Sequence, residues 1–188
     1  MYAVIEGIDT AGKSTQLALL ETKYKKAIFT KEPGGTKIGT KLRKMVLNGQ
    51  AKSKIAEMFI FLADRAEHIE ELISKNKNKD IISDRSLISG IAYASNFELD
   101  KMIELNLFAT NNLLPTHVIL LELSSDELKN RLSKKQNDSI ELRGINYLLN
   151  TQNRMKETIK KLNLNHIFID ASLNIEEIEK QIEDFLNA

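Results

Sequence analysis

The chain of 188 residues contains no cysteine. This absence excludes disulfides, thiol nucleophiles and zinc or iron–sulfur sites built on cysteine. Prolines are also scarce: only Pro33 and Pro115 occur, each beside an expected strand or helix end. No apolar run approaches the roughly 20 residues that a membrane-spanning helix needs. We therefore expect no membrane-spanning segment and no membrane partner.

Neither sign of charge predominates. Lysines and arginines total 27 against 26 aspartates and glutamates, which gives a formal net charge of +1. Because nucleic-acid binding usually leaves a strongly basic footprint, we expect no nucleic-acid polymer as a partner. The opening residues, MYAVIEGID, lack the basic start and long apolar stretch of a signal peptide. We therefore expect a cytoplasmic protein.

Short apolar runs alternate along the chain with longer segments of helical periodicity. The expected strands are residues 2–5, 27–30, 81–83, 118–123 and 167–169. The expected helices are residues 14–25, 38–47, 54–73, 100–111, 126–134, 145–162 and 175–186, the last beginning after Asn174 as N-cap. Runs that are apolar throughout suit strands buried on both faces. The alternation predicts an α/β fold in one domain, residues 1–188, with a mostly parallel five-stranded sheet covered by helices on both faces.

A phosphate-binding motif follows the first expected strand. Residues 7–14 read GIDTAGKS and fit the P-loop pattern G-x-x-x-x-G-K-[ST]. The glycines let backbone N–H groups turn toward a phosphate, and the following helix adds the positive end of its dipole. In this pattern Lys13 reaches the β- and γ-phosphates and the Ser14 hydroxyl binds Mg²⁺. A chance glycine turn is the competing interpretation, but glycine is only about 7% of residues, so the full pattern rarely arises by accident.

The motif predicts a nucleotide without specifying the reaction. A GTP-dependent switch needs a guanine-reading N-K-x-D, and the nearest match, residues 76–79, has lysine in place of the aspartate. The D-x-x-G element of such switches occurs only inside the P-loop itself. A GTP-dependent switch is therefore disfavoured.

Charged residues follow two other expected strands. Asp84 could hold the water shell of Mg²⁺ or orient an attacking oxygen, and Arg85 could clamp a phosphate. A surface ion pair is the competing interpretation of these two residues. The segment KEPGGT at residues 31–36 opens a loop at the same edge of the sheet, and Arg43 could point back toward it.

One helix carries a candidate base-binding pair. Phe61 and Arg65 are four residues apart and share a face, so a ring could stack on a base while a guanidinium reads its edge. The competing interpretation makes Phe61 part of the core and Arg65 a solvated charge. His68 is expected to be structural or exposed.

Taken in order, these residues resemble the bacterial thymidylate kinase family of P-loop nucleoside monophosphate kinases. The match runs over about residues 1–160 and comprises the P-loop with Asp9, EPGGT at 32–36, LR at 42–43, F-L-A-x-R at 61–65, DR at 84–85 and S-x-x-A-Y at 89–93. The resemblance implies a three-layer P-loop NTPase fold with a short lid at about residues 132–144. It also implies transfer of the γ-phosphate of ATP to dTMP, with Mg²⁺, by a homodimer whose interface includes the long helix at 54–73.

The resemblance implies roles for individual residues. The ATP-binding residues would be Gly7, Ile8, Asp9, Thr10, Ala11, Gly12, Lys13, Ser14, Thr15 and Arg131. The dTMP-binding residues would be Asp9, Glu32, Pro33, Arg43, Phe61, Arg65, Arg85, Ser89 and Tyr93. Phe61 would stack on thymine, Arg65 would bind its O4 edge, and Tyr93 would crowd the 2′ position of the sugar. The catalytic residues would be Asp9, Lys13, Arg85 and Arg143, and the Mg²⁺ ligands Ser14 and Asp84.

Several positions depart from the family pattern. Lys31, Ser86 and Ala94 replace the usual arginine, tyrosine and glutamine. The P-loop holds Thr10 rather than arginine, so a lid cation is expected to support transfer. Within LSKKQNDSIELRG the candidates are Lys134, Lys135 and Arg143; we expect Arg143, with Arg131 as the alternative.

Two other functions are weighed against a dTMP kinase. Ala94 leaves room for a kinase of another nucleoside monophosphate. A nucleotide-binding regulator without transfer activity is the third possibility. The presence of Asp9, Lys13, Asp84 and Arg85 together argues against that regulator, because a binder has no need of a full acceptor site.

Overall fold

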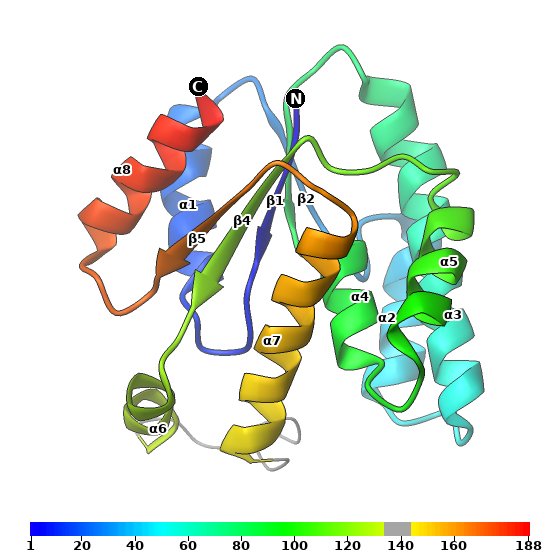
Figure 1. The fold of residues 1–188 in the computed structure, drawn as a ribbon. Helices are drawn as coiled ribbons and strands as arrows, with labels where there is room; N and C mark the ends of the chain where they lie inside the picture. The colour runs from blue at the N-terminus through cyan, green and yellow to red at the C-terminus, as the bar shows by residue number, and fades with distance from the viewer. Residues whose placement is uncertain (134–143) are drawn as a thin grey trace.

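The computed structural model describes residues 1–133 and 144–188 and is built on a five-stranded sheet in the order β2-β3-β1-β4-β5. The strands are β1 Tyr2–Glu6, β2 Ile28–Lys31, β3 Ile81–Asp84, β4 His117–Glu122 and β5 His166–Asp170. Each neighbouring pair is parallel, so the carboxyl ends of all these strands meet at one edge (Figure 1). The expected α/β fold is confirmed, and the sheet is wholly parallel.

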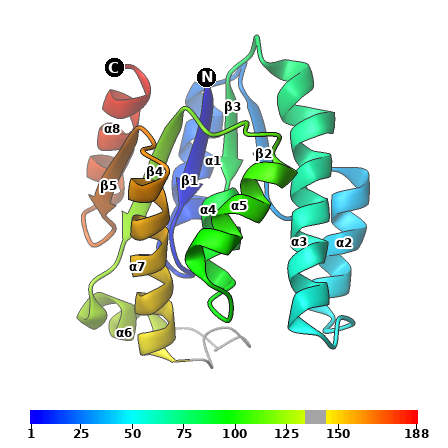
Figure 2. The same ribbon diagram turned by 45° about the vertical axis from the view of Figure 1, so that its right-hand side comes forward.

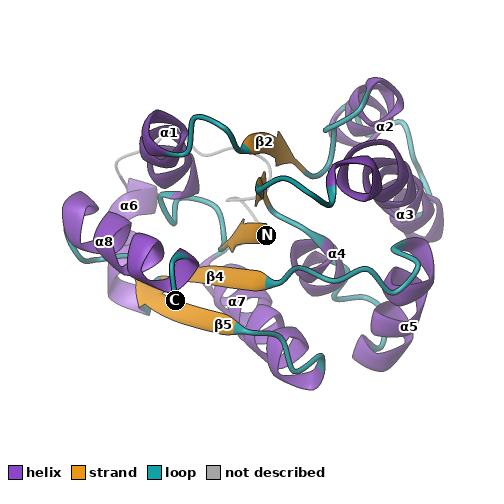
Figure 3. Ribbon diagram, turned by 90° about the horizontal axis from the view of Figure 1, so that it is seen from above, coloured by secondary structure: helices purple, strands orange, loops and turns teal. Residues whose placement is uncertain are grey.

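Helices cover both faces of the sheet. The α-helices are α1 Lys13–Lys23, α2 Lys37–Leu47, α3 Lys54–His68, α4 Leu87–Tyr93, α5 Leu99–Ala109, α6 Ser125–Ser133, α7 Ile145–Lys161 and α8 Ile175–Leu186. Helices α1 and α8 pack together on one face and α4 and α7 on the other (Figure 3). Helices α2 and α3 pack together beyond the β2 edge (Figure 2). None of the helices in the two described stretches combines the length and apolar character that a bilayer crossing requires.

The core follows from this layering. Strand β1 is buried along its whole length, and β4 is buried at its four central residues. Central strands of a parallel sheet lose solvent on both faces, which explains why these runs are apolar. The edge strands β2 and β5 are only partly buried. One charged residue, Glu6, ends β1 with no exposed surface at all.

Two helical segments differ from the sequence expectation. The helix expected over residues 54–73 is α-helical to His68 and continues as a π-helical turn, Ile69–Ile73, and a 3₁₀ turn, Ser74–Asn76. The apolar spacing did not indicate this change, because Ile69 and Ile73 remain buried in the π-helical turn. Helix α4 was not expected. It is short and buried on most of its surface, so it has no polar stripe from which a period could be read.

The order of the strands places the ligand edge. From β1 the chain builds β2 and β3 on one side and β4 and β5 on the other, so β1 lies at a topological switch point. Open parallel sheets bind ligands beyond the carboxyl ends of their strands at such a point. The P-loop begins directly after β1, and β3 ends beside it, since Ile5 of β1 pairs with Asp84 of β3.

The expected N-cap of α8 is present and supports a stability prediction. The Asn174 side chain accepts a hydrogen bond of 2.8 Å from the Glu177 N–H. We expect Asn174→Ala to lower the free energy of unfolding by about 1 kcal/mol, because an N–H of the first turn loses its acceptor. Asn174→Ser should retain most of the stability. Urea denaturation of the three proteins measures this, and equal stability of the alanine and serine variants would contradict the capping role.

Candidate active site

The P-loop joins β1 to α1 at the carboxyl edge of the sheet (dark-blue loop in Figure 1). Its first glycine, Gly7, has φ of +150°, and a Cβ there would lie 2.9 Å from the backbone oxygen of Leu121 in β4. Only glycine allows both this backbone conformation and this approach. The loop is therefore seated against β4 and leads into the N-terminus of α1, which is a favourable place for an anion.

Lys13 lies inside the P-loop. Its Nζ donates to the backbone oxygens of Gly7 and Ile8, each at 3.1 Å, and the residue is only 8% exposed. Burial and the nearby charge of Arg85 lower the pKa of Lys13 to about 8. A bound phosphate would place anionic oxygens beside this ammonium and stabilise its charged form.

Arg131 of α6 lies against the same loop. Its Nη1 donates to the backbone oxygen of Thr10 at 2.9 Å and its Nη2 to that of Ala171, just after β5, at 2.5 Å. Its Nε donates to Glu127 one turn earlier in α6 at 2.6 Å. The guanidinium is thus held beside the P-loop from three directions.

Arg85 occupies the position after β3 and faces the P-loop. Its backbone has φ of +71°, a left-handed conformation that is uncommon for a residue with a side chain. Its Nη2 donates to Asp9 at 2.7 Å, and its Nη1 donates to the backbone oxygen of Gly7 at 3.0 Å and to the Ser89 hydroxyl at 2.8 Å. Residues distant in sequence therefore meet at one point between the P-loop and α4.

Tyr93 at the end of α4 adds an aromatic wall to this point. The Arg85 guanidinium lies 5.2 Å from the centre of the Tyr93 ring, within the range of a cation–π contact. The Tyr93 hydroxyl is buried and has no hydrogen-bond partner within the described part of the chain. Burial raises the pKa of Tyr93 to about 12, against the opposing charge of Arg85. The ring is therefore neutral at physiological pH.

Glu32 and Arg65 form a buried ion pair. Arg65 Nε donates to Glu32 at 2.9 Å, and His68 Nδ1 lies 2.8 Å from the other carboxylate oxygen. Arg65 also donates from Nη1 to Asn106 at 2.5 Å and from Nη2 to the backbone oxygen of Ser86 at 3.2 Å. Burial alone would raise the pKa of Glu32, but the Arg65 charge and His68 outweigh it and lower that pKa. Arg65 is 4% exposed, so its interpretation as a solvated charge is wrong, whereas the structural interpretation of His68 is confirmed.

Arg65 also lies against α4. A Cβ on Gly90 of α4 would lie 2.6 Å from Arg65 Nη2, so this position makes room for the guanidinium. Phe61, one turn earlier in α3, is half-buried. Phe61 and Arg65 therefore share one face of α3. The hydrogen bonds of Arg65 direct its side chain toward α5 and the start of α4.

The EPGG loop after β2 carries the other arginine of interest. Arg43 of α2 turns back, and its Nη1 donates to the backbone oxygen of Pro33 at 2.9 Å. Asp64 of α3 accepts a hydrogen bond of 2.9 Å from the Gly34 N–H. The loop is thus held from both α2 and α3 at the carboxyl edge of the sheet, as the sequence predicted for Arg43.

The acidic residues near the P-loop fit a shared metal site. One carboxylate oxygen of Asp9 and one of Asp84 are buried and have no hydrogen-bond partner among residues 1–133 and 144–188. Ser14 is exposed at the start of α1. The described residues contain no cluster of three or more acidic or histidine side chains that could enclose a metal alone. This donor set suits Mg²⁺, which is typically held by one or two carboxylates together with phosphates and water.

Comparison with known proteins decides the family. A family model described as thymidylate kinase matches residues 5–182. The chain belongs to the thymidylate kinase family. The resemblance drawn from the sequence motifs is thereby confirmed.

Individual relatives agree with this assignment. A thymidylate kinase of Aliarcobacter butzleri is 74% identical over 187 residues, which cover 100% of this chain and 99% of the relative. A thymidylate kinase of Wolinella succinogenes is 52% identical over 97% of this chain and 96% of its own length. A thymidylate kinase of Campylobacter jejuni subsp. jejuni is 48% identical over 99% of this chain and 100% of its own length. The similarity therefore extends over the whole chain.

In this thymidylate kinase family member, most of the expected site residues meet at the carboxyl edge. The expected lid lies mostly outside the described residues. Lys134, Lys135 and Arg143 lie outside the described residues, as does most of the segment 132–144. Of the two arginines considered for the lid, only Arg131 has described contacts, and these are with the P-loop and its neighbours.

Sequence reasoning missed two buried polar residues of this family member. Glu6 accepts hydrogen bonds from Ser86 and Ser89, and Asn106 accepts one from Arg65. Burial raises the pKa of Glu6, while the two serines oppose that rise. One signal was available for Glu6, because it is a charged residue continuing an apolar strand directly into the P-loop. Asn106 lies within a helix and gives no such signal.

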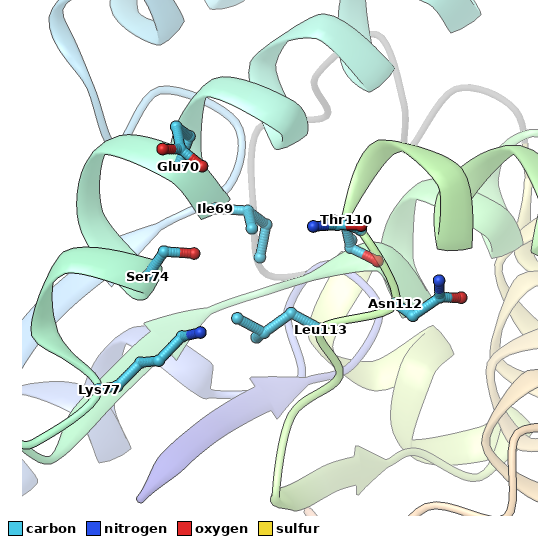
Figure 4. A pocket seen from close by; sticks show the side chains of 8 residues that line it. Ile69, Glu70, Ser74, Lys77, Thr110, Asn112 and Leu113 are labelled. Carbon is cyan, nitrogen blue, oxygen red and sulfur yellow. The ribbon is translucent and has the colours of Figure 1, made fainter.

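A separate hollow of about 290 Å³ lies at the other end of the fold. Figure 4 shows its walls, with Ile69, Glu70, Ser74 and Lys77 on one side and Thr110, Asn112 and Leu113 on the other. Both walls precede strands, β3 and β4 respectively, so they lie toward the amino ends of the strands. The hollow is therefore distinct from the nucleotide edge.

The buried ion pair yields a stability prediction. We expect Glu32→Gln to lower the free energy of unfolding by about 3 kcal/mol, because it leaves the Arg65 charge buried without a counter-charge. Glu71→Gln is the matched control, since Glu71 pairs with Lys75 on the solvent-exposed surface and such pairs contribute little. Urea denaturation measures both. Equal losses of unfolding free energy for the two substitutions would show that the buried pair stabilises the protein no more than an exposed one.

Proposed function

We propose that this member of the thymidylate kinase family transfers the γ-phosphate of ATP to dTMP, giving dTDP and ADP for dTTP biosynthesis. The observation that carries the proposal is the ion pair of 2.7 Å between Asp9 and Arg85. It joins the P-loop, the expected ATP site, to the residue after β3 that is expected to hold the acceptor phosphate. Donor and acceptor phosphates would therefore bind side by side. We assign the enzyme to the cytoplasm, as expected from its opening residues.

The donor site comprises residues 7–15 and Arg131. Backbone N–H groups of the P-loop hold the ATP phosphates. Lys13 gives up its hydrogen bonds to the Gly7 and Ile8 carbonyls and donates to phosphate oxygens instead. Arg131, fixed beside Thr10, packs against the adenine ring.

Mg²⁺ is assigned to Ser14 and Asp84. These residues would hold the ion, which would supply positive charge to offset that of the phosphates. The carboxylate oxygen of Asp84 that lacks a donor within the described parts of the chain supports this assignment, because a buried oxygen of this kind is a ready ligand.

The acceptor phosphate is assigned to Arg43 and Arg85, with Asp9 organising the site. Both arginines present N–H groups at the carboxyl edge, where Arg43 is held on Pro33 and Arg85 on Asp9. Guanidinium groups bind phosphate oxygens in pairs, which fixes orientation as well as charge. Glu32 borders this site through Pro33.

The thymidine part is assigned to Phe61, Arg65 and Tyr93. Phe61 stacks on the base, and Arg65 retains N–H groups, beyond those bound to Glu32, Asn106 and Ser86, for the O4 edge. Tyr93, fixed against Arg85, crowds the 2′ position and so favours deoxyribose.

Transfer needs neither a covalent intermediate nor a general base, because the acceptor is already a phosphate anion. The residues must hold two like-charged phosphates in line and neutralise them, which is the main demand of phosphoryl transfer. Lys13, Arg43 and Arg85 contribute positive charge, and we assign a further cation, Arg143, to the lid. Closure of the lid over the site excludes water and suppresses ATP hydrolysis.

A coupled assay of ADP release, with ATP–Mg²⁺ and each nucleoside monophosphate in turn, tests the proposal. We expect selective turnover with dTMP, and a loss of about 100-fold or more in kcat/KM for Arg85→Ala, which removes several charged hydrogen bonds. Lys161→Ala is the control, because its partner Asp100 lies on the exposed surface.

Each contrary outcome is specific. Turnover with UMP, CMP or GMP instead of dTMP would contradict the base-binding roles of Phe61 and Arg65. An absence of turnover with every acceptor would favour a nucleotide-binding regulator. Unchanged turnover of Arg85→Ala on dTMP would contradict the acceptor site.

We also propose that the chain forms a homodimer through α2 and α3. Five exposed apolar side chains gather on these two packed helices: Ile38, Met45, Leu47, Ile55 and Phe59, which are 38–66% exposed. Ile38 and Met45 are two turns apart in α2, and Ile55 and Phe59 one turn apart in α3, so each pair shares a face. Apolar faces of this kind are typical of interfaces between copies of a chain.

The dimer predicts a mass of about twice 21.3 kDa. Phe59→Asp should shift the protein toward the monomer, because it puts a charge into the apolar contact. Phe108→Asp is the control, since Phe108 is 86% exposed on α5 and outside the group. Light scattering after size exclusion measures the masses, and a monomeric parent protein would refute the dimer.

A further inference from the structure

Glu6 is the most buried charged group near the nucleotide edge, and the proposed mechanism does not use it. It ends β1, has no exposed surface and directly precedes the first glycine of the P-loop. A buried carboxylate is costly unless hydrogen bonds compensate it. Its presence within an apolar strand therefore requires a compensating structure.

Two serine hydroxyls from one short segment supply that compensation. Ser86 Oγ donates to Glu6 Oε1 at 2.7 Å, and Ser89 Oγ donates to Glu6 Oε2 at 2.5 Å. Both serines are buried, and both belong to the segment that follows β3 and begins α4. The carboxylate thus ties the end of β1 to two residues that follow Arg85 within one turn.

The two serine hydroxyls differ in the hydrogen bonds that they accept. Ser89 Oγ accepts a hydrogen bond of 2.8 Å from Arg85 Nη1. From the described residues, Ser86 Oγ accepts only the Ile88 N–H at the start of α4. A hydroxyl has one hydrogen. Because Ser89 gives that hydrogen to Glu6, its lone pairs remain for Arg85. The carboxylate therefore sets the direction in which Ser89 meets the guanidinium.

Arg85 needs this support because its backbone is in the left-handed region and its side chain must face the P-loop. Asp9 holds Nη2, while Nη1 is shared between the Gly7 carbonyl and Ser89. Gly7 itself follows Glu6 in the chain. Both partners of Nη1 are thus placed by the end of β1.

We infer that Glu6 is a positioning residue for the acceptor phosphate: acting through the Ser89 hydroxyl, it holds Arg85 in the orientation that binds dTMP. The inference rests on the proposed function, and in particular on the role of Arg85. It also gives Ser89 a role through Arg85 rather than through the nucleotide itself.

Steady-state kinetics of three variants test the inference. Ser89→Ala should raise the KM for dTMP about tenfold, the loss expected for one hydrogen bond to a charged group, with the KM for ATP changed less than about twofold. Ser86→Ala is the matched control: it removes the other hydrogen bond to Glu6 and a helix cap, so it should lower the melting temperature but change the KM for dTMP less than about twofold. Glu6→Gln should raise the KM for dTMP in the same direction as Ser89→Ala.

A double-mutant cycle shows whether Glu6 and Ser89 affect the KM for dTMP through one another or independently. If Glu6 acts through Ser89, the Glu6→Gln/Ser89→Ala protein should have a KM for dTMP close to that of Ser89→Ala alone. Multiplied effects, or equal KM changes in Ser89→Ala and Ser86→Ala, would overturn the inference and leave Glu6 a structural residue. The two serine variants decide the matter if Glu6→Gln does not fold. A parent enzyme without dTMP turnover would overturn the proposed function together with this inference. The kinetics of the variants bear on the inference alone.

Discussion

The parallel pairing of β1 with β3 is the constraint from which the rest of the site follows. Because Ile5 pairs with Asp84, the P-loop and the Asp84-Arg85 segment leave the sheet side by side. The Arg85 N–H extends this pairing by donating to the Ile5 carbonyl at 3.0 Å. A shift of one residue would turn every side chain of β3 to the opposite face. The contact between Asp9 and Arg85 therefore depends on the strand register as well as on the two side chains.

Buried charge near the site is the second organising feature. Glu6 ends β1 and Glu32 follows β2, two strands separated by β3. Glu6 is compensated by Ser86 and Ser89, and Glu32 by Arg65. In a low-dielectric surrounding such groups tolerate little displacement, because an unpaired buried charge is costly. Local stability and the geometry of the proposed phosphate and base sites are consequently coupled. The apolar core alone would not impose this precision on Arg65 and Arg85.

The sequence predicted the features that depend on neighbours along the chain. The strands, the P-loop and the cap at Asn174 are local patterns, and the structure agrees with them. The buried contacts could not be predicted in this way, since Arg65 meets Asn106 across 41 positions and Glu6 meets Ser86 across 80. Helix α4 escaped prediction for a different reason, because burial on most of its surface removes the polar face that marks a helix. Arg65 shows the limit clearly: the spacing indicated its face, but only the fold shows that it is buried.

The cations at the nucleotide edge each have a partner within the protein already. Lys13 and Arg131 each donate hydrogen bonds to two backbone carbonyls, and Arg43 donates to one. Arg85 donates to a carboxylate, a carbonyl and a hydroxyl. The protein thus carries its own stand-ins for the oxygens of a nucleotide. An incoming phosphate gains only the difference between its own contacts and those it displaces. Small solvent anions, which offer few oxygens and little charge, have correspondingly little to gain there, so discrimination against them is present before any substrate arrives.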